Sequence, residues 1–111
     1  ILYGAYHPIS VVPSDDRPRQ EQDVIVGGPL CESGDIFTQQ EGGFVSSRRL
    51  PEADVGEYLV LECAGAYGAV MGSNYNSKPH AAEVLVVEGQ AELVRRRQSS
   101  EDLFRDERIP G

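Results

Sequence analysis

The sequence lacks the marks of a membrane, secreted or nucleic-acid-binding protein. No apolar run approaches the roughly 18 residues that a membrane span requires, and no charged segment followed by an apolar stretch indicates a signal peptide. The formal net charge of −8 argues against binding to a nucleic-acid backbone, which favours a basic stripe. The one dense basic run, 95–97, is flanked by acidic residues and is more typical of a solvated or interface face than of an anion site. We therefore expect neither a membrane nor a nucleic acid as a partner.

Cysteine and histidine are also scarce. The two cysteines, Cys31 and Cys63, are too few for a disulfide scaffold. One bridge could form between them, but a reduced pair in a cytoplasmic protein is the favoured interpretation. Together with His7 and His80 they show no close metal-ligand spacing, so we expect no metal site.

Lysine is almost absent, since Lys78 stands alone beside nine arginines. A lysine that attacks a carbonyl group must be desolvated and held on a rigid element. Lys78 lies between Ser77 and Pro79 in a polar stretch and fits that role poorly. We therefore reject it as a catalytic amine.

The 111 residues are enough for one domain with a modest core, and 40% hydrophobic with 25% charged residues is typical of a globular protein. The chain begins at Ile1 rather than at Met, inside strand-like sequence. We therefore expect it to be a piece of a longer polypeptide.

The pattern predicts a mainly β domain, with a barrel or sandwich as the default architecture. Pairs of β-rich runs separated by Gly, Pro and acidic turns favour strands over helices. The expected strands are 1–12, 23–30 (buried), 58–63, 83–87 and 90–96. We expect a mobile loop at 14–22, loops or turns over 38–57, and a hairpin at Glu88-Gly89. A short C-terminal helix should begin at a cap formed by Ser99 or Ser100.

The stretch CESGD at 31–35 is the first candidate site. A free thiol titrates near ~8.5, and neighbouring carboxylates disfavour the thiolate. With Glu32 beside it and Asp35 four positions on, Cys31 should stay protonated, which favours a proton donor over a nucleophile. From these residues alone, a buried structural cysteine at a strand end is the stronger alternative.

Two further stretches are candidates. In AGAYGAVMGSNYN, 64–76, small residues allow close approach of a ligand or another chain, and Tyr67 projects a hydroxyl group from a crowded turn. Tight packing of two β layers explains that stretch equally well. Tyr3, Tyr6 and His7 form the third group, for which a packed strand is the favoured interpretation.

Taken together, four motifs suggest a family. LYGAYHP at 2–8, CESGD, AGAYGAVMGSNYN and RRRQSSEDLFRDER at 95–108 follow one another in this order. The combination closely resembles the C-terminal part of diaminopimelate decarboxylases, the pyridoxal-phosphate enzymes that make lysine. The resemblance covers nearly all of the chain, and only 14–22 and 38–57 look individual.

The resemblance implies that residues 1–111 are a C-terminal β-domain, with an N-terminal (β/α)8 barrel holding the pyridoxal phosphate. It also implies a homodimer with active sites at its interface, to which the CESGD segment is contributed by the opposite subunit. By position, Cys31 looks like the residue that reprotonates the α-carbon, in agreement with the protonated thiol. Glu32 looks like the contact to the distal amino group of the substrate. Tyr67 looks like a contact to cofactor and substrate, and Tyr3 like a substrate contact.

The family's substrate-binding arginine would fall before Ile1. Its barrel lysine and glycine-rich phosphate site are absent, so the isolated chain is predicted to be inactive. Gly72 replaces a common serine or alanine of the motif. The family's β-domain also uses a strand from before the barrel, so this chain should expose an unpaired sheet edge.

The parent enzyme is predicted to decarboxylate meso-diaminopimelate at its D-centre, giving L-lysine and carbon dioxide. One alternative is a related decarboxylase of ornithine, arginine or carboxynorspermidine. Glu32 is the residue that discriminates, because a carboxylate there fits a substrate with a distal ammonium group. The distal carboxylate of the substrate would need the arginine that falls before Ile1, so this chain holds half of the evidence. The other alternative is a stand-alone β-domain that acts as a binding or assembly module.

Overall fold

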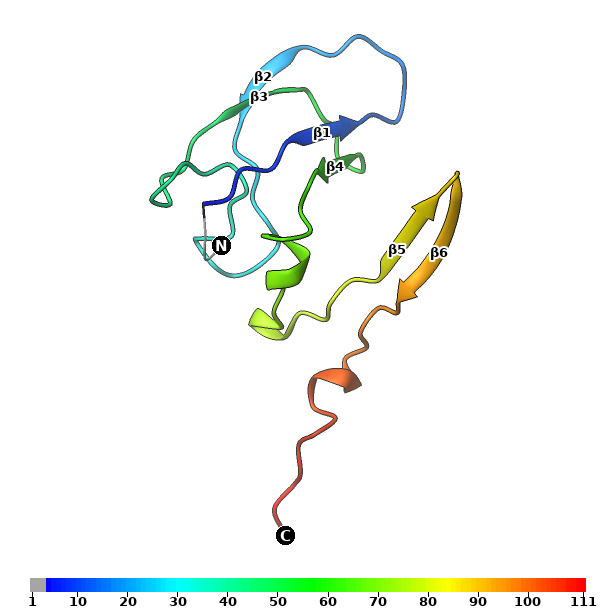
Figure 1. Ribbon diagram of the computed structural model, residues 1–111. Helices are drawn as coiled ribbons and strands as arrows, with labels where there is room; N and C mark the ends of the chain where they lie inside the picture. Colours follow the sequence, from blue (N-terminus) through cyan, green and yellow to red (C-terminus); the bar gives the residue numbers. More distant parts are fainter. Residues whose placement is uncertain (1–3) are drawn as a thin grey trace. The chain divides into compact units, whose positions relative to one another are not determined.

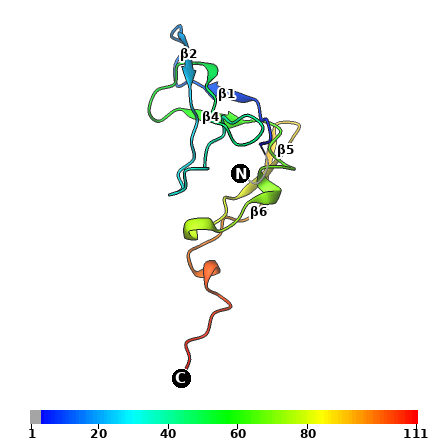
Figure 2. The same cartoon turned by 90° about the vertical axis from the view of Figure 1, so that its left-hand side faces the viewer.

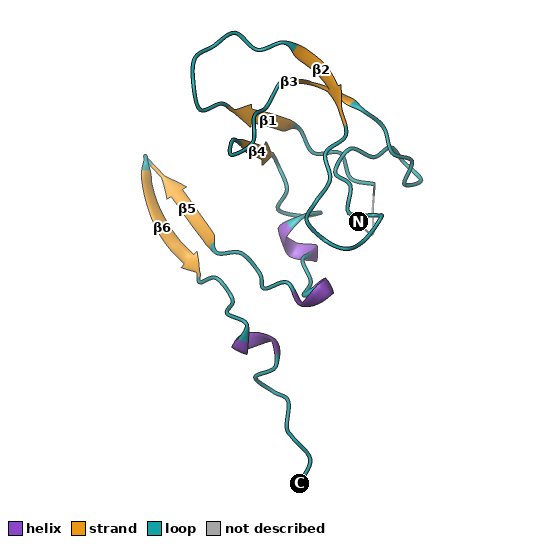
Figure 3. Ribbon diagram, turned by 180° about the vertical axis from the view of Figure 1, so that it is seen from behind, coloured by secondary structure: helices purple, strands orange, loops and turns teal. Residues whose placement is uncertain are grey.

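The computed structural model describes residues 4–111, which fall into two compact units, Ile1–Met71 and Gly72–Gly111. Six strands of the described residues form three separate antiparallel pairs, shown as arrows in Figure 1. The helical content of the described residues is limited to short 3-10 turns, drawn in purple in Figure 3. The mainly β class predicted from the sequence is confirmed.

Two strand pairs build the first unit. Strand β1 (Ile9–Val12) pairs with β4 (Tyr58–Leu61), and β2 (Glu21–Val24) pairs with β3 (Arg48–Pro51). β1 and β4 run side by side in both Figure 1 and Figure 2. The 3-10 turn η1 (Ala69–Met71) ends this unit.

The core of the first unit is small. Val26 and Leu50 are the buried hydrophobic side chains among the described residues, each 8% exposed, and the Thr38 side chain is fully enclosed. Next to them an open cleft of about 300 Å³ is lined by residues of all four strands. The four strands therefore surround an apolar centre without closing over it.

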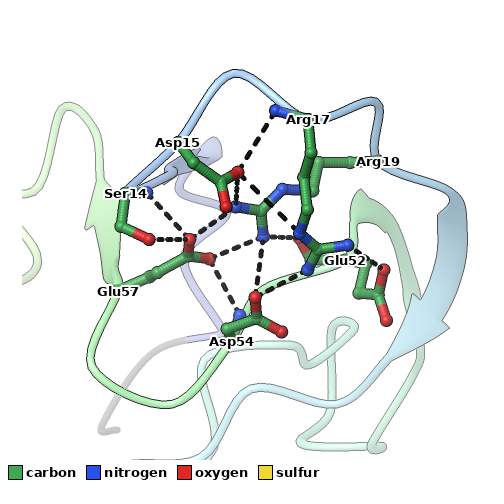
Figure 4. A network of polar contacts seen from close by, with 7 residues as sticks. All are labelled: Ser14, Asp15, Arg17, Arg19, Glu52, Asp54 and Glu57. Atoms are coloured by element: carbon green, nitrogen blue, oxygen red, sulfur yellow. Dashed lines mark hydrogen bonds and ion pairs between the residues drawn. The ribbon is translucent and has the colours of Figure 1, made fainter.

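A network of ion pairs joins the loop after β1 to the turn before β4 (Figure 4). At its centre the carboxylate of Glu57, whose side chain is 2% exposed, binds the guanidinium of Arg19 at 2.6 Å. It also accepts hydrogen bonds from the Ser14 amide and the Asp54 amide, both at 2.8 Å. Arg17 adds a 2.6 Å ion pair to Asp54. The segment 14–22 is thus a loop as far as residue 20, as predicted, but one that is tied to the turn rather than a loose tip.

The second unit contains the predicted hairpin. Strands β5 (Glu83–Val87) and β6 (Gln90–Arg95) pair across Glu88 and Gly89. Both turn residues have positive φ, 49° and 77°, as a two-residue type I′ turn requires. The 3-10 turns η2 (Tyr75–Ser77) and η3 (Glu101–Leu103) lie on either side of the hairpin in sequence.

Several sequence-based expectations for the first unit need correction. The buried strand expected at 23–30 is instead β2, which ends at Val24 and is largely exposed. The pairing partner β3 occupies part of a stretch predicted to be loop and turn. Both strands are rich in charge, and their pairing is supported by the facing residues Asp23 and Arg49, which form an ion pair at 3.5 Å. Strands that pair through charged side chains show no alternation of apolar and polar residues, so the sequence pattern did not indicate them.

The predicted short C-terminal helix is present as the single 3-10 turn η3. Ser100 occupies its N-cap position, as predicted, but makes no side-chain capping bond. The carboxylate of Asp102 accepts a hydrogen bond from the Ser99 amide at 2.8 Å instead. It also receives both guanidinium nitrogens of Arg96, which holds the pKa of Asp102 well below its usual range. The contacts of the Asp102 carboxylate, rather than a serine side chain, therefore hold the start of η3.

A closed barrel is not formed by the described residues, because each sheet has only two strands. Every strand consequently has one edge without a ladder partner within 4–111, in agreement with the expected open edge. The hairpin of the second unit also exposes apolar side chains, with Leu85 and Val86 at 49% and 65%. None of the helices in the described part of the chain is long and apolar enough to cross a membrane.

Candidate functional site

The loop that carries Cys31 and Glu32 is closed at its base by a short antiparallel ladder. The Phe37 amide donates to the Val26 carbonyl at 2.8 Å, and the Gly28 amide donates to the Asp35 carbonyl at 2.7 Å. On the buried side the Val26 amide donates to the Thr38 hydroxyl oxygen at 3.1 Å. The loop residues 29–34 therefore project from a base in which the segments 26–28 and 35–38 are hydrogen-bonded to each other around the bridge of Gly27 and Ile36.

Asp35 fills the inside of this loop. Its side chain is buried, with the residue 8% exposed, and its Oδ2 accepts a hydrogen bond from the Leu30 amide at 2.9 Å. The same carboxylate occupies the space that a Cβ on residue 28 would need, so a side chain there would displace the Asp35 carboxyl group. In the sequence Asp35 counted only as a nearby charge, whereas the structure gives it a place under the loop.

Glu32 forms the tip of the loop together with the residues that follow it. The Asp35 amide donates to the Glu32 carbonyl at 3.1 Å, and the Gly34 amide donates to Glu32 Oε1 at 2.8 Å. Gln39 adds a side-chain hydrogen bond to the Gly34 carbonyl at 3.1 Å. The tip is therefore a tight turn, hydrogen-bonded to the side chain of Glu32 and to that of Gln39.

Cys31 and Glu32 are both exposed on this loop. The alternative of a buried structural cysteine is therefore wrong. Cys63 is exposed as well. The structure therefore presents a thiol and a carboxylate on adjacent exposed residues.

Tyr67 lies on a second turn of the same unit, between β4 and η1. Two backbone hydrogen bonds, each between residues five apart in the chain, shape this turn. The Ala69 amide donates to the Ala64 carbonyl at 2.7 Å, and the Val70 amide donates to the Gly65 carbonyl at 3.0 Å. Gly68 lies so close to the Ala64 carbonyl that a side chain there would overlap it, whereas a Cβ on Gly65 would meet open space. Glycine at 68 thus serves the turn itself, and Tyr67, 57% exposed, is presented on its outside.

The third candidate, Tyr3, lies outside the described residues. The segment after it is anchored by Arg48, whose guanidinium lies 4.1 Å from the centre of the Tyr6 ring. Arg48 also donates to the His7 carbonyl and, at 3.5 Å, to the carbonyl of Phe37. One side chain therefore links the segment that follows Tyr3 to the base of the Cys31 loop. This link could not be predicted from the sequence, because it joins residues far apart in the chain.

The remaining charged groups act as structural pairs. Among the described residues no three His, Cys, Asp or Glu side chains gather as metal ligands. Lys78 is exposed in a loop, where its carbonyl accepts a hydrogen bond from the Asn74 side chain at 2.9 Å. Arg95 pairs with Glu83 at 2.6 Å and Arg96 with Asp102, which fits the prediction of a solvated face.

Glu57 has the most perturbed carboxyl group of the first unit. Its hydrogen bonds to the Arg19 guanidinium, and then to the Ser14 and Asp54 amides, hold its pKa well below the usual range. The same contact raises the pKa of Arg19. This cluster lies on a different loop from Cys31 and Glu32, and we assign it to folding rather than to chemistry.

Comparison with known proteins places these features in a family. The family model described as "Pyridoxal-dependent decarboxylase, C-terminal sheet domain" matches residues 1–65. Diaminopimelate decarboxylase of Escherichia coli K12 is 56% identical over 106 residues, which cover 93% of this chain and 25% of that protein. The enzyme of the same name from Streptomyces coelicolor is 47% identical over 99% of this chain and 26% of its own length.

Solved structures agree with the sequence comparison. A crystal structure of diaminopimelate decarboxylase superposes with a TM-score of 0.87 at 55% identity, covering 94% of this chain and 25% of that one. Diaminopimelate decarboxylase from Helicobacter pylori in complex with L-lysine gives a TM-score of 0.74 at 36% identity, over 94% of this chain and 23% of that one. The chain spans about a quarter of the length of these relatives. It belongs to the pyridoxal-dependent decarboxylases and corresponds to their C-terminal sheet domain.

Proposed function

We propose that the chain is the C-terminal sheet domain of a diaminopimelate decarboxylase, which converts meso-diaminopimelate to L-lysine and carbon dioxide with pyridoxal phosphate. The observation that carries the proposal is the exposed Cys31–Glu32 pair on a loop that is hydrogen-bonded at its base and at its tip. The identity of 56% to the Escherichia coli enzyme over nearly the whole chain supports the substrate assignment.

In this proposal Cys31 supplies a proton. Pyridoxal phosphate, when bound, withdraws the electron pair that loss of carbon dioxide leaves on the α-carbon. The Cys31 thiol then donates its proton from Sγ to that carbon, and solvent reprotonates the sulfur. The proposal gives the thiol the role of a general acid and not that of a nucleophile.

Glu32 and Tyr67 would bind the substrate. The carboxylate of Glu32 is a partner for the distal ammonium group, and the loop holds it one residue from the proton donor. Tyr67 offers an aromatic ring and a hydroxyl group on a turn whose backbone is tightly bonded, which suits a contact to cofactor and substrate. Tyr3 would add a further substrate contact.

The residues present fit one side of a cofactor site but not its covalent attachment. The only lysine, Lys78, is exposed on a polar loop and lacks the desolvated surroundings that such an amine needs. The attaching lysine and the phosphate site would therefore belong to another domain. We propose an N-terminal (β/α)8 barrel for it and a cytoplasmic homodimer in which the Cys31 loop enters the site of the opposite subunit.

A substrate assay of the full-length protein tests this assignment. We expect release of carbon dioxide from meso-diaminopimelate and slow or no turnover of ornithine and arginine. Glu32→Gln should raise KM for meso-diaminopimelate by roughly tenfold or more, because a charge-assisted hydrogen bond to the ammonium group is lost. Glu41→Gln, at an exposed glutamate of the same unit, is the matched control. Turnover of ornithine, arginine or carboxynorspermidine in place of meso-diaminopimelate would refute the substrate assignment.

A further inference from the structure

The loop that presents Cys31 and Glu32 depends on a residue that touches neither of the proposed chemical steps. We propose that Asp35 is a positioning residue, whose buried carboxylate, packed against Gly28, fixes the backbone on which Cys31 and Glu32 are presented. This inference rests on the proposed function, because it concerns the same loop.

The first support is where the carboxylate lies. Asp35 closes the ladder at the loop base through its backbone, since its carbonyl accepts the Gly28 amide at 2.7 Å. Its side chain then turns under the loop and accepts the Leu30 amide at 2.9 Å. Leu30 immediately precedes Cys31. The hydrogen bond therefore holds the Pro29–Leu30 peptide, which lies one residue before the thiol.

The second support is steric. A Cβ on Gly28 would overlap the carboxyl group of Asp35, with all three nearest atoms belonging to that group. The carboxyl group thus lies in direct contact with Gly28, on the segment that leads into the loop. Since Asp35 is only 8% exposed, few other side-chain positions are open to it.

The third support is that the loop tip is bonded from the same residue. The Asp35 amide donates to the Glu32 carbonyl at 3.1 Å, which closes the turn that holds Glu32. The amide, carbonyl and carboxylate of Asp35 therefore bind Glu32, Gly28 and Leu30 in turn. A shift of Asp35 would move the proton donor and the ammonium contact together.

Two substitutions separate the hydrogen bond from the shape of the side chain. Asp35→Leu keeps the branched shape of the side chain, with bulkier ends, and removes the acceptor, whereas Asp35→Asn keeps the size and an oxygen acceptor for the Leu30 amide. In the full-length holoenzyme we expect Asp35→Leu to lower kcat by at least tenfold and to raise KM, because both Cys31 and Glu32 are displaced. Asp35→Asn should recover most of the activity. Gly28→Ala should reproduce the effect of Asp35→Leu from the opposite side of the contact.

A double-mutant cycle tests positioning against a general loss of stability. If Asp35 acts through Cys31, adding Asp35→Leu to Cys31→Ala should cost little further kcat, whereas independent effects would multiply. Hydrogen exchange measured by mass spectrometry should show faster exchange of the peptide around Leu30 in Asp35→Leu. The alkylation rate of Cys31, referred to that of Cys63 in the same protein, should also change.

The outcomes distinguish this inference from the proposed function. If wild-type protein fails to decarboxylate meso-diaminopimelate, the proposed function fails, while exchange and alkylation still report on Asp35. Wild-type kcat in Asp35→Leu and Gly28→Ala, with unchanged exchange at Leu30, would overturn the positioning role. Multiplicative loss in the double mutant would overturn it as well. Should Asp35→Leu not fold, Asp35→Asn, which keeps the acceptor in place, is compared with Asp35→Glu, which moves the acceptor by one methylene group, and equal loss in both would count against the role.

Discussion

Asp35 Oδ2 lies 2.9 Å from the amide nitrogen of Leu30, directly beneath the loop that carries the exposed Cys31. This contact joins the loop that carries the proposed proton donor to a buried carboxylate. The exposed side of the loop holds a thiol and a carboxylate, and the buried side holds the acceptor that keeps the backbone in place. The turn that carries Tyr67, the small core, the Arg48 contacts and the Glu57 ion pair can each be tested by substitution.

Gly68 is predicted to be required for the turn that carries Tyr67. Gly68→Ala places a methyl group against the Ala64 carbonyl, a backbone atom that cannot move aside without breaking the turn. We expect a loss of roughly 1–3 kcal/mol in stability, typical of overpacking, together with lower activity. Gly65→Ala is the matched control, because its Cβ meets open space. Thermal unfolding of the full-length protein measures both; equal effects would contradict the assignment.

Leu50 is predicted to carry a large share of the packing in the first unit. Leu50→Ala should destabilise the protein by about 2–5 kcal/mol, as expected for truncation of a buried leucine. Val55, whose side chain is fully exposed in the turn after β3, supplies the control, and Val55→Ala should stay within about 0.5 kcal/mol. Urea unfolding decides between them. A Leu50→Ala cost no greater than that of the control would show that the small core does not hold this unit.

Arg48 is predicted to hold the segment after Tyr3 against the base of the Cys31 loop. Arg48→Met removes the ring contact to Tyr6 and both hydrogen bonds to carbonyl oxygens. We expect a stability loss of about 1–3 kcal/mol and a higher KM for substrate. Arg49→Met is the neighbouring control, since its ion pair with Asp23 is exposed and should contribute little. Steady-state kinetics that cannot tell the two variants apart would argue against a role for Arg48.

Glu57 is predicted to make the first unit sensitive to acid. Its folded-state pKa is lowered by Arg19 and two backbone amides, so its contribution to stability is fully present above the unfolded pKa of about 4.3. That contribution is lost as pH falls below this value toward the folded pKa. Glu57→Gln should therefore lower Tm at pH 7, and the difference from wild type should shrink as pH is lowered from 5 to 3.

Glu41→Gln serves as the control in this series and should leave Tm unchanged at each pH. A Tm difference between Glu57→Gln and wild type that stays constant from pH 7 to pH 3 would contradict the linkage. The measurement is calorimetry of both variants and wild type at matched ionic strength, because salt screens exposed pairs.

The parts of the fold that the sequence predicted are those set by local chemistry. The β5–β6 hairpin follows from Glu88-Gly89, and the run at 58–63 forms β4 as far as Leu61. The pair β2–β3 was missed because its register depends on partners far apart in sequence, such as Asp23 and Arg49. The number of expected strands did not reveal whether they close into a barrel. Closure needs a continuous ladder of strands, and the described residues form three separate pairs instead.

The candidate site shows the same division. Cys31, Glu32 and Tyr67 were selected from motifs, and the structure places the first two on one exposed loop and the third on a separate turn. Asp35, in contrast, was counted as a charge, because only the fold reveals that its carboxylate points under the loop toward Leu30. Arg48 could not be found from the sequence at all, because its contacts reach across about forty residues.

Replacement of Cys31 tests the central claim most directly. In the full-length protein, Cys31→Ala should lower kcat for decarboxylation of meso-diaminopimelate by roughly 10²–10⁴-fold, the range for loss of a positioned general acid. Cys63→Ala, at the other exposed cysteine, should retain the activity of the wild type. The account predicts this contrast between the two thiols; wild-type kcat in Cys31→Ala, or an equal loss in both variants, would contradict it.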